Sequence, residues 1–260
     1  MEVRLDGRNA IITGGSLGIG FAMASRFARS GANVVIVARR RDVLDRAAEA
    51  IRKKAATEVV AIAGDVSRAD DCTRVFETAK SALGRIDILV NNAGTSQRAP
   101  FEQISDDDWQ ADLDLKLFAV IRLCRLALPE MRSRRWGRVI NILNTGAKAP
   151  PAEGAPTAVS RAAGLALTKT LAGEYAPYNV LINSLHVGRI ESDQWERRHA
   201  KQGGGNSLEL FYAEMGKIIP LGRVGKAEEF ANMACFLASD AGSYVTGTAI
   251  NVDGGLCPVP

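Results

Sequence analysis

Short runs of apolar, β-branched residues alternate along the chain with longer stretches in which apolar positions recur at helical spacing. Seven of the short runs predict β-strands, namely NAIITGG, ANVVIVAR, EVVAIAGD, IDILVNNAG, RVINILN, NVLINSLH and TAINVDGG. Stretches between them, such as GFAMASRFARSG and DVLDRAAEAIRKKA, predict amphipathic helices. Strands that are apolar on both faces and separated by helices are typical of a parallel sheet with helices on both sides. Because α/β folds of 260 residues often remain undivided, we expect a single domain over residues 1–260.

One irregular stretch interrupts this alternation. It covers about residues 189–219 and contains KQGGGNS between two short helical patterns. Its position after the sixth predicted strand makes it a candidate lid over a substrate site, and a surface loop fits the same pattern. The residues Trp195, Leu208, Phe211 and Tyr212 predict a partly apolar pocket beneath it.

Composition and charge narrow the classes of function. Hydrophobic residues make up 47% and charged residues 24% of the chain, and the net charge is only +4. The densest basic run, Arg132 to Arg138, falls at a predicted helix end and is expected to be a solvated cap, so we predict no nucleic-acid partner. We expect no membrane association, because no apolar run approaches the roughly 18 residues that cross a bilayer. Four cysteines lie far apart without a CxxC pair, which predicts no metal site and a reducing cytoplasm.

The turn after the first predicted strand, IITGGSLGIG, carries Gly14, Gly18 and Gly20. Glycine lets the backbone turn tightly and approach a pyrophosphate, whose charge then lies at the N-terminus of the following helix. Asp65, after the third strand, could accept a hydrogen bond from an adenine amino group, and NNAG (Asn91–Gly94) closes the fourth strand. Open α/β sheets bind ligands at this carboxyl edge. The pattern therefore predicts a dinucleotide site.

The second predicted strand ends in VVIVARRR. Folds that select NAD usually carry an acidic residue here for the ribose 2′-hydroxyl, whereas an arginine suits a 2′-phosphate. Ala38 and Arg39 therefore favour NADP(H) over NAD(H) as the cofactor.

Several motifs occur together and in a fixed order: TGGSLGIG, GDVS, NNAG and the segment LGRVGKAEEFANMACFLASDAGSYVTGTAINVDGG. On these motifs the sequence resembles the short-chain dehydrogenase/reductase family over almost its whole length. The resemblance implies a Rossmann-type three-layer αβα sandwich with a seven-stranded parallel sheet, a bound nicotinamide dinucleotide, a small-molecule substrate and a homotetramer, or else a homodimer. The cofactor contacts that it implies are Gly14, Ser16, Leu17, Gly18, Ile19, Gly20, Arg39, Asp65, Val66, Asn92, Ala93, Gly94, Arg161, Gly188 and Ile190.

The family's catalytic residues are an asparagine, a serine, a tyrosine and a lysine. The resemblance implies that this chain has a different residue type at each of these four positions. The asparagine position, in DLDLKLF, is Lys116, and the serine position, after INIL, is Asn144. The tyrosine and lysine positions, in TAVSRAAG, are Thr157 and Arg161. No shift of register restores the pair, because none of the four tyrosines is followed by a lysine four positions later.

These replacements remove the usual general acid. A phenol can be tuned toward neutral pH, whereas an aliphatic hydroxyl such as that of Thr157 is far too weak an acid. Arg161 keeps a positive charge and donors for ribose hydroxyls, and the Asn144 amide can donate to a developing oxyanion. We therefore expect cofactor binding to survive and the usual proton transfer to fail.

Three classes of function remain. The first, which we favour, is an NADP-linked oxidoreductase that acts on an unidentified carbonyl or alcohol through a relocated proton donor, for which Lys116, Lys148, Glu153 and His186 are the candidates. His186 also fits a hydrogen-bonded spacer at a strand end. The second class is a catalytically silent dinucleotide-binding homologue that serves as a partner or sensor. The third is a non-redox lyase or hydratase on the same fold.

Lys116 gives the sharpest hypothesis. The resemblance places it across from position 161, so the ammonium group lost there could have moved to position 116. Burial and repulsion by Arg161 would lower the pKa of Lys116 and let it donate a proton through the Thr157 hydroxyl. The opposing expectation is a lysine that extends from a helix surface to solvent.

Overall fold

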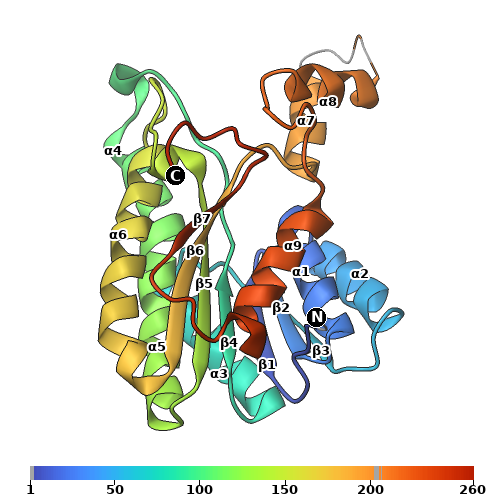
Figure 1. Cartoon of the computed structure of the whole chain (residues 1–260), viewed down its shortest axis with the longest axis vertical. Helices are drawn as coiled ribbons and strands as arrows, with labels where there is room; N and C mark the ends of the chain where they lie inside the picture. The colour runs from blue at the N-terminus through green and yellow to red at the C-terminus, as the bar shows by residue number, and fades with distance from the viewer. Residues whose placement is uncertain (1–2, 202–204, 206) are drawn as a thin grey trace.

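Seven parallel strands form one sheet in the order β3-β2-β1-β4-β5-β6-β7 in the computed structural model, which describes residues 3–201, 205 and 207–260 (Figure 1). The strands are β1 Asn9–Thr13, β2 Asn33–Ala38, β3 Val59–Ala63, β4 Ile88–Asn91, β5 Gly137–Asn144, β6 Val180–Val187 and β7 Ala249–Val252. Each coincides with one of the predicted runs, so that prediction is confirmed. The strand order reverses between β1 and β4, and ligands bind beyond the carboxyl ends of the strands at such a reversal.

Helices cover both faces of this sheet, which confirms the three-layer αβα sandwich. They are α1 Gly18–Arg29, α2 Arg41–Arg52, α3 Ala69–Leu83, α4 Asp106–Leu113, α5 Ala119–Ser133, α6 Thr157–Tyr175, α7 Asp193–Lys201, α8 Leu208–Gly216 and α9 Ala227–Ala238. Helices α1, α2 and α9 pack on one face, and α3, α5 and α6 pack on the other (Figure 1).

The core explains why the central strands are largely apolar on both faces. Neighbouring residues of a strand point to opposite faces. In β1, Ile12 packs in the cluster under α1 and α9, and Ile11 packs in the cluster under α3 and α5; both are fully buried. A strand covered on both faces therefore loses the polar alternation of a half-exposed strand.

The segment 189–219 contains the two short helices that the sequence predicts, α7 and α8, which stand above the carboxyl edge of the sheet (Figure 1). Part of KQGGGNS, residues 202–204 and 206, lies outside the described residues. Trp195, Phe211 and Tyr212 pack against a small buried cluster of Met215, Ile219 and Val224, while Leu208 is half-buried. The role of this segment as a substrate lid stays a prediction.

The basic run Arg132–Arg138 leads from the end of α5 into β5. Arg138 is 1% exposed, and its guanidinium lies 4.3 Å from the centroid of the Trp136 ring. The guanidinium of Arg8 lies 3.6 Å from the same centroid, so the indole is flanked by cation–π contacts. Burial lowers the pKa of Arg138 to about 10, which leaves it charged at neutral pH. The expectation of a solvated cap is therefore wrong for Arg138.

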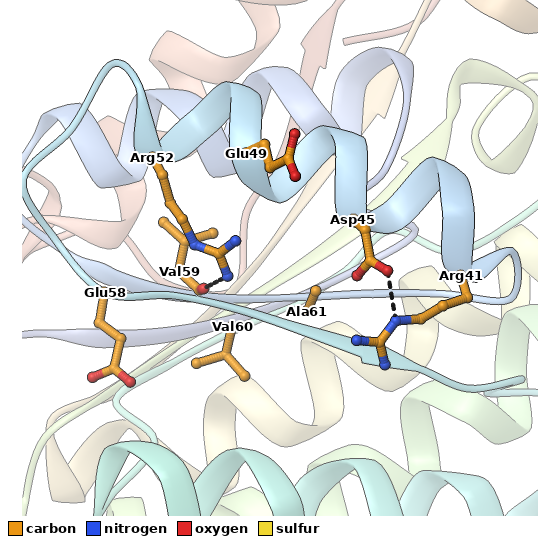
Figure 2. A pocket seen from close by; sticks show the side chains of 8 residues that line it. All are labelled: Arg41, Asp45, Glu49, Arg52, Glu58, Val59, Val60 and Ala61. Carbon is orange, nitrogen blue, oxygen red and sulfur yellow. Dashed lines mark hydrogen bonds and ion pairs between the residues drawn. The ribbon is translucent and has the colours of Figure 1, made fainter.

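A hollow of about 540 Å³ lies beside β3, the edge strand, under α2 (Figure 2). Arg52 Nη2 donates to the carbonyl of Val59, and Arg41 Nε donates to Asp45 Oδ2 at 2.8 Å. Charged side chains over an edge strand discourage pairing with a strand of another chain. This hollow lies along the edge of the sheet and not at its carboxyl end, so it is separate from the predicted dinucleotide site.

Candidate active site

The turn between β1 and α1 needs its glycines. Gly14 and Gly18 have φ angles of 66° and 54°, a region that L side chains rarely adopt. A methyl group built on Gly20 would lie 2.1 Å from the Gly14 carbonyl oxygen. Leu17 is the N-cap of α1 and makes no side-chain capping bond, and the first turn holds no acidic residue. The backbone amides at this helix end therefore remain available to an anion such as a diphosphate.

The NNAG segment is tied to the same turn. The Thr13 hydroxyl accepts the amide N–H groups of Asn92, at 2.9 Å, and of Ala93, at 3.0 Å. Asn92 Nδ2 donates to the carbonyls of Thr13, at 2.9 Å, and Gly14, at 3.2 Å. These bonds hold two of the predicted cofactor contacts, Asn92 and Ala93, beside the glycine turn.

The residues predicted at the adenosine end follow β2 and β3. Arg39 is exposed and makes no hydrogen bond or ion pair with the described residues, so its guanidinium is free to bind a phosphate. Asp65 Oδ1 accepts from the amide and hydroxyl of Ser67, at 3.1 and 2.8 Å, which fixes the carboxylate in place. Val66 beside it is buried.

Arg161 lies at the centre of the carboxyl edge. Its Nη1 donates to the carbonyl of Ile142 in β5 at 2.7 Å, and no other hydrogen bond to the described residues is made by its guanidinium. A methyl group built on Gly94 would lie 2.4 Å from Arg161 Nη2, so the glycine lets the guanidinium keep this position without shifting. Burial lowers the pKa of Arg161 to about 10. At neutral pH the side chain is therefore a cation with free donors next to NNAG, which suits ribose hydroxyls.

Lys116 is fully buried, so the expectation that it extends to solvent is wrong. It lies in a π-helical turn, Asp114–Phe118, between α4 and α5. Its Nζ forms an ion pair with Asp112 and donates to Thr157 Oγ1 at 2.7 Å. Burial lowers the pKa of Lys116 to about 8; Asp112 opposes that shift, and repulsion by Arg161 adds to it. The sequence predicts a lowered pKa for Lys116, and the value of about 8 agrees with that direction.

The Thr157 hydroxyl is saturated with hydrogen bonds. It accepts from Lys116 and from the Gln97 amide at 3.0 Å, and its single hydrogen reaches the Gln97 carbonyl at 2.7 Å. Ser160 Oγ donates to Asp112 Oδ2 at 2.6 Å. Asp112, Lys116, Thr157 and Ser160 thus form one buried polar cluster with Gln97, hereafter the Lys116 cluster.

Sequence reasoning missed three members of the Lys116 cluster: Asp112, Ser160 and Gln97. A signal existed for Asp112, because it precedes Lys116 by four residues and such a pair shares one helix face. Ser160 lies one turn after Thr157 on α6, so its spacing also places the two residues on one face of a helix. Nothing in the sequence indicates that the loop containing Gln97 reaches Thr157, the first residue of α6.

Asn144 ends β5 at the same edge. Its Oδ1 is buried and has no hydrogen-bond partner among the described residues. A buried amide group that lacks a partner costs free energy unless a ligand or water supplies one. Because an amide oxygen only accepts, the partner that Oδ1 lacks must be a donor, such as a water or an O–H or N–H group of a ligand.

The other predicted proton donors are occupied or remote. His186 is fully buried, and its Nδ1 lies 3.0 Å from the carbonyl of Asn144, which can only accept. Nδ1 therefore carries the hydrogen, and Nε2 accepts from Ser184 Oγ at 3.1 Å. Burial lowers the pKa of His186 to about 4, so the ring is neutral. Lys148 Nζ donates to the Ala249 carbonyl at 2.5 Å, and Glu153 is exposed in a turn. His186 thus has the contacts of a hydrogen-bonded spacer.

Gly188 and Ile190 follow β6 toward the lid segment. A methyl group on Gly188 would lie 2.4 Å from Asp253 Cβ, which explains the glycine. Ile190 is 4% exposed and forms a parallel bridge with Gly225. Both residues lie beyond the carboxyl end of β6, as their predicted role requires.

In the described ranges, no group of three or more histidine, cysteine, aspartate or glutamate side chains is arranged to hold a metal ion. No helix within those ranges is long and apolar enough to cross a bilayer. The four cysteines are free, three of them buried and Cys257 half-buried.

A glycine turn at a helix N-terminus, a fixed NNAG segment and the half-buried cation Arg161 at the carboxyl edge are the features of a dinucleotide-binding α/β fold. The chain belongs to the short-chain dehydrogenase/reductase family. Its residues 14–257 match the family model described as enoyl-(acyl carrier protein) reductase.

Relatives named as reductases, dehydrogenases and oxidoreductases cover nearly the whole chain. The 3-oxoacyl-[acyl-carrier-protein] reductase FabG of Aquifex aeolicus is 32% identical over 98% of this chain and 100% of its own length. The oxidoreductase UcpA of Escherichia coli is 38% identical over 97% of this chain and 95% of its own.

Two solved structures that contain NADPH are similar to this chain over its whole fold. L-sorbose reductase of Gluconobacter frateurii, complexed with NADPH and L-sorbose, has a TM-score of 0.95 and 33% identity over 100% of both chains. An NADPH-bound short chain oxidoreductase of Pseudomonas aeruginosa, described as containing an atypical catalytic center, has a TM-score of 0.92 and 34% identity over 99% of both chains.

Proposed function

We propose that this chain is an NADP(H)-dependent oxidoreductase that reduces a carbonyl, or oxidises an alcohol, of a small molecule, with Lys116 and Thr157 replacing the family's tyrosine and lysine as the proton donor. The observation that carries the proposal is the 2.7 Å hydrogen bond from Lys116 Nζ to Thr157 Oγ1, at the position where the family has its acid. NADPH-bound relatives of similar fold support the choice of cofactor.

Separate residues of the chain bind the cofactor, contact the substrate and transfer the proton. The bound cofactor would supply a hydride. Arg161 would hold the ribose through its free guanidinium donors, and the amide nitrogen of Asn144 would donate to the substrate oxygen. As charge develops on that oxygen, the Thr157 hydroxyl turns its hydrogen away from the Gln97 carbonyl and gives it up. Lys116 transfers an ammonium proton to Thr157 Oγ1 and becomes neutral, which a pKa of about 8 permits.

Removing the Thr157 hydroxyl is expected to stop this relay. Thr157→Val should lower kcat for carbonyl reduction by about 10²-fold, while Thr157→Ser, which keeps a hydroxyl, should retain most of it. In the unaltered chain the reduction rate should fall as pH rises through about 8, because deprotonated Lys116 has no proton to give. Steady-state kinetics against pH and NADPH titration check both variants. Equal rates for the valine and serine variants, with intact NADPH binding, would contradict the relay.

A silent dinucleotide-binding protein is the second candidate, and the saturation of the Thr157 hydroxyl favours it. Thr157 is 3% exposed, and the only hydrogen of its hydroxyl is already donated to the Gln97 carbonyl. This candidate predicts NADPH binding without turnover on any carbonyl compound. The same titration and kinetic panel separate the two candidates.

Arg39 is expected to set the preference for NADP(H). Arg39→Asp should weaken NADPH binding by about tenfold or more, because a charge-assisted phosphate contact is replaced by repulsion, and should improve NADH binding. Lys53→Asp, the same charge change at an exposed lysine next to the far end of α2, is the matched control and should alter neither affinity. Fluorescence titration with both reduced cofactors gives the result. A ratio of affinities unchanged by Arg39→Asp would refute the assignment.

The proposal includes a homotetramer in a reducing cytoplasm. Phe118 and Val159, on the π turn and α6, are exposed by 39% and 50%, and Leu221 and Tyr244 are exposed by 68% and 102%. Such apolar exposure suits contacts between copies of the chain. Four free cysteines fit a reducing compartment. Sedimentation of the purified chain should give a mass near four times 27.8 kDa.

A further inference from the structure

Arg122 contacts both ends of the π turn that carries Lys116. The turn covers Asp114–Phe118, and Arg122 follows it on α5. Arg122 Nη2 donates to Asp114 Oδ1, in the first residue of the turn, at 2.8 Å. The guanidinium also lies 5.3 Å from the centroid of the ring of Phe118, the last residue of the turn. One side chain therefore braces the π turn over its whole length.

The same guanidinium anchors the turn to another element. Arg122 Nη1 donates at 2.7 Å to the carbonyl of Ser67, in the loop between β3 and α3. That carbonyl belongs to a fixed residue, because the amide and hydroxyl of Ser67 donate to Asp65. On the α4 side, Gln110 Nε2 donates to Asp114 Oδ2 at 2.8 Å. Asp114 is thus held from α4 and from α5, and Arg122 ties it to the loop after β3.

The register of the π turn decides where Lys116 lies. π turns are rare inside helices, and they hold one residue more than the α-helical turn that would replace them. One residue corresponds to a rotation of about 100° about the helix axis. A turn that relaxed to α-helical geometry would therefore carry Lys116 out of the Lys116 cluster, away from Asp112 and from the Thr157 hydroxyl.

The brace lies nearer to the surface than the group it holds. The side chains of Arg122 and Asp114 are 23% and 26% exposed, whereas that of Lys116 is inaccessible to solvent. A partly exposed ion pair contributes little to the free energy of unfolding. Weakening the brace should therefore change the position of Lys116 more than the stability of the fold.

We propose that Arg122 is a positioning residue for the proton donor: it holds the π turn in register and so keeps Lys116 inside its cluster. The inference rests on the proposed function, in which Lys116 protonates Thr157. It adds to that function a residue outside the cluster, which acts on the reaction through Lys116.

The acidity of Lys116 reports its position. Among the described residues, Asp112 of α4 and Arg161 of α6 are the charged groups that act on the pKa of Lys116. Burial has the largest effect and lowers this pKa to about 8. If the turn loses its register, water reaches the ammonium group and its pKa rises toward the ordinary value of 10.5. Relief from burial outweighs the weaker contact with Asp112, because burial is the larger effect.

Steady-state kinetics of carbonyl reduction against pH test the brace. Arg122→Gln should lower kcat about tenfold and leave KM for the carbonyl compound nearly unchanged, since misplacing a catalytic group by about 1 Å can cost about 10²-fold. The pH at which the rate falls should rise by about one unit. Asp114→Asn, which removes only the charge of the brace, should shift both quantities in the same direction by less. Arg125→Gln, at an exposed arginine of α5, is the matched control and should change neither.

The pH dependence of urea unfolding gives a readout that needs no turnover. In the unaltered chain the free energy of unfolding should begin to rise near pH 8, because the unfolded chain then binds more protons. In Arg122→Gln this rise should begin at higher pH and be smaller. A uniform loss of stability with an unchanged pH dependence, or an unchanged pH–rate profile, overturns the inference. Absence of carbonyl reduction by the unaltered chain overturns the proposed function, and unfolding then still decides whether Arg122 holds Lys116 in its cluster.

Discussion

Restoring the family's four residue types should give a carbonyl reductase at least about 10²-fold and up to about 10⁴-fold faster than the Thr157→Val variant, which has no acid at position 157. The changes are Asn144→Ser, Thr157→Tyr and Arg161→Lys, combined with Lys116→Asn. Together they supply a phenol whose pKa a neighbouring lysine can lower. The measurement is NADPH consumption with L-sorbose and 3-oxoacyl compounds, the substrates named for two of the relatives.

The Lys116 cluster is the reason for changing four residues at once. A tyrosine at 157 gives up the threonine bonds to Gln97 and Lys116, and a buried ammonium left beside it would repel the new lysine at 161. The variant that keeps Lys116 is therefore the control, and it should be much slower than the fourfold variant. A folded, NADPH-binding fourfold variant without activity on the whole panel would contradict the expectation.

The ion pair of Asp112 and Lys116 should show a large effect on stability. Both side chains are essentially inaccessible to solvent, so removing one partner leaves a buried charge uncompensated. Lys116→Met, and separately Asp112→Leu, should each lower the free energy of unfolding by about 3–5 kcal/mol. The double variant should lose clearly less than the sum, because it buries no unpaired charge. Urea unfolding of the four proteins completes the cycle; strictly additive losses would rule out the coupling.

The same pair predicts a pH dependence of stability. Lys116 has a pKa of about 8 in the folded chain and an ordinary value of 10.5 when unfolded. Between these values the unfolded chain binds more protons, so the free energy of unfolding should rise with pH, by about 3 kcal/mol over the whole range. Below pH 8 Lys116 contributes no slope. The double variant, which lacks both groups, should lack this rise, and an identical slope in both proteins would count against a buried, titrating Lys116.

The fold could be predicted from the sequence because its determinants are local. The central strands are short β-branched runs buried on both faces, and Gly14 and Gly18 of the first turn have positive φ angles, which favour glycine. The Lys116 cluster could not be predicted in the same way. Its π turn carries Lys116 into the interior instead of onto a helix surface, and Gln97 reaches Thr157 from a loop far away in sequence. Such contacts depend on the packing of three separate segments.

The close approach of Gly94 and Arg161 has a consequence for how the NNAG segment and the cation influence each other. A methyl group at position 94 would lie 2.4 Å from Arg161 Nη2, whereas the nearest backbone atom would be 3.9 Å away. An alanine at 94 would therefore leave the backbone in place and push the guanidinium aside. The glycine thus sets where the free donors of Arg161 lie, so a change in one motif would be felt as a misplaced cation in another that is far from it in the sequence.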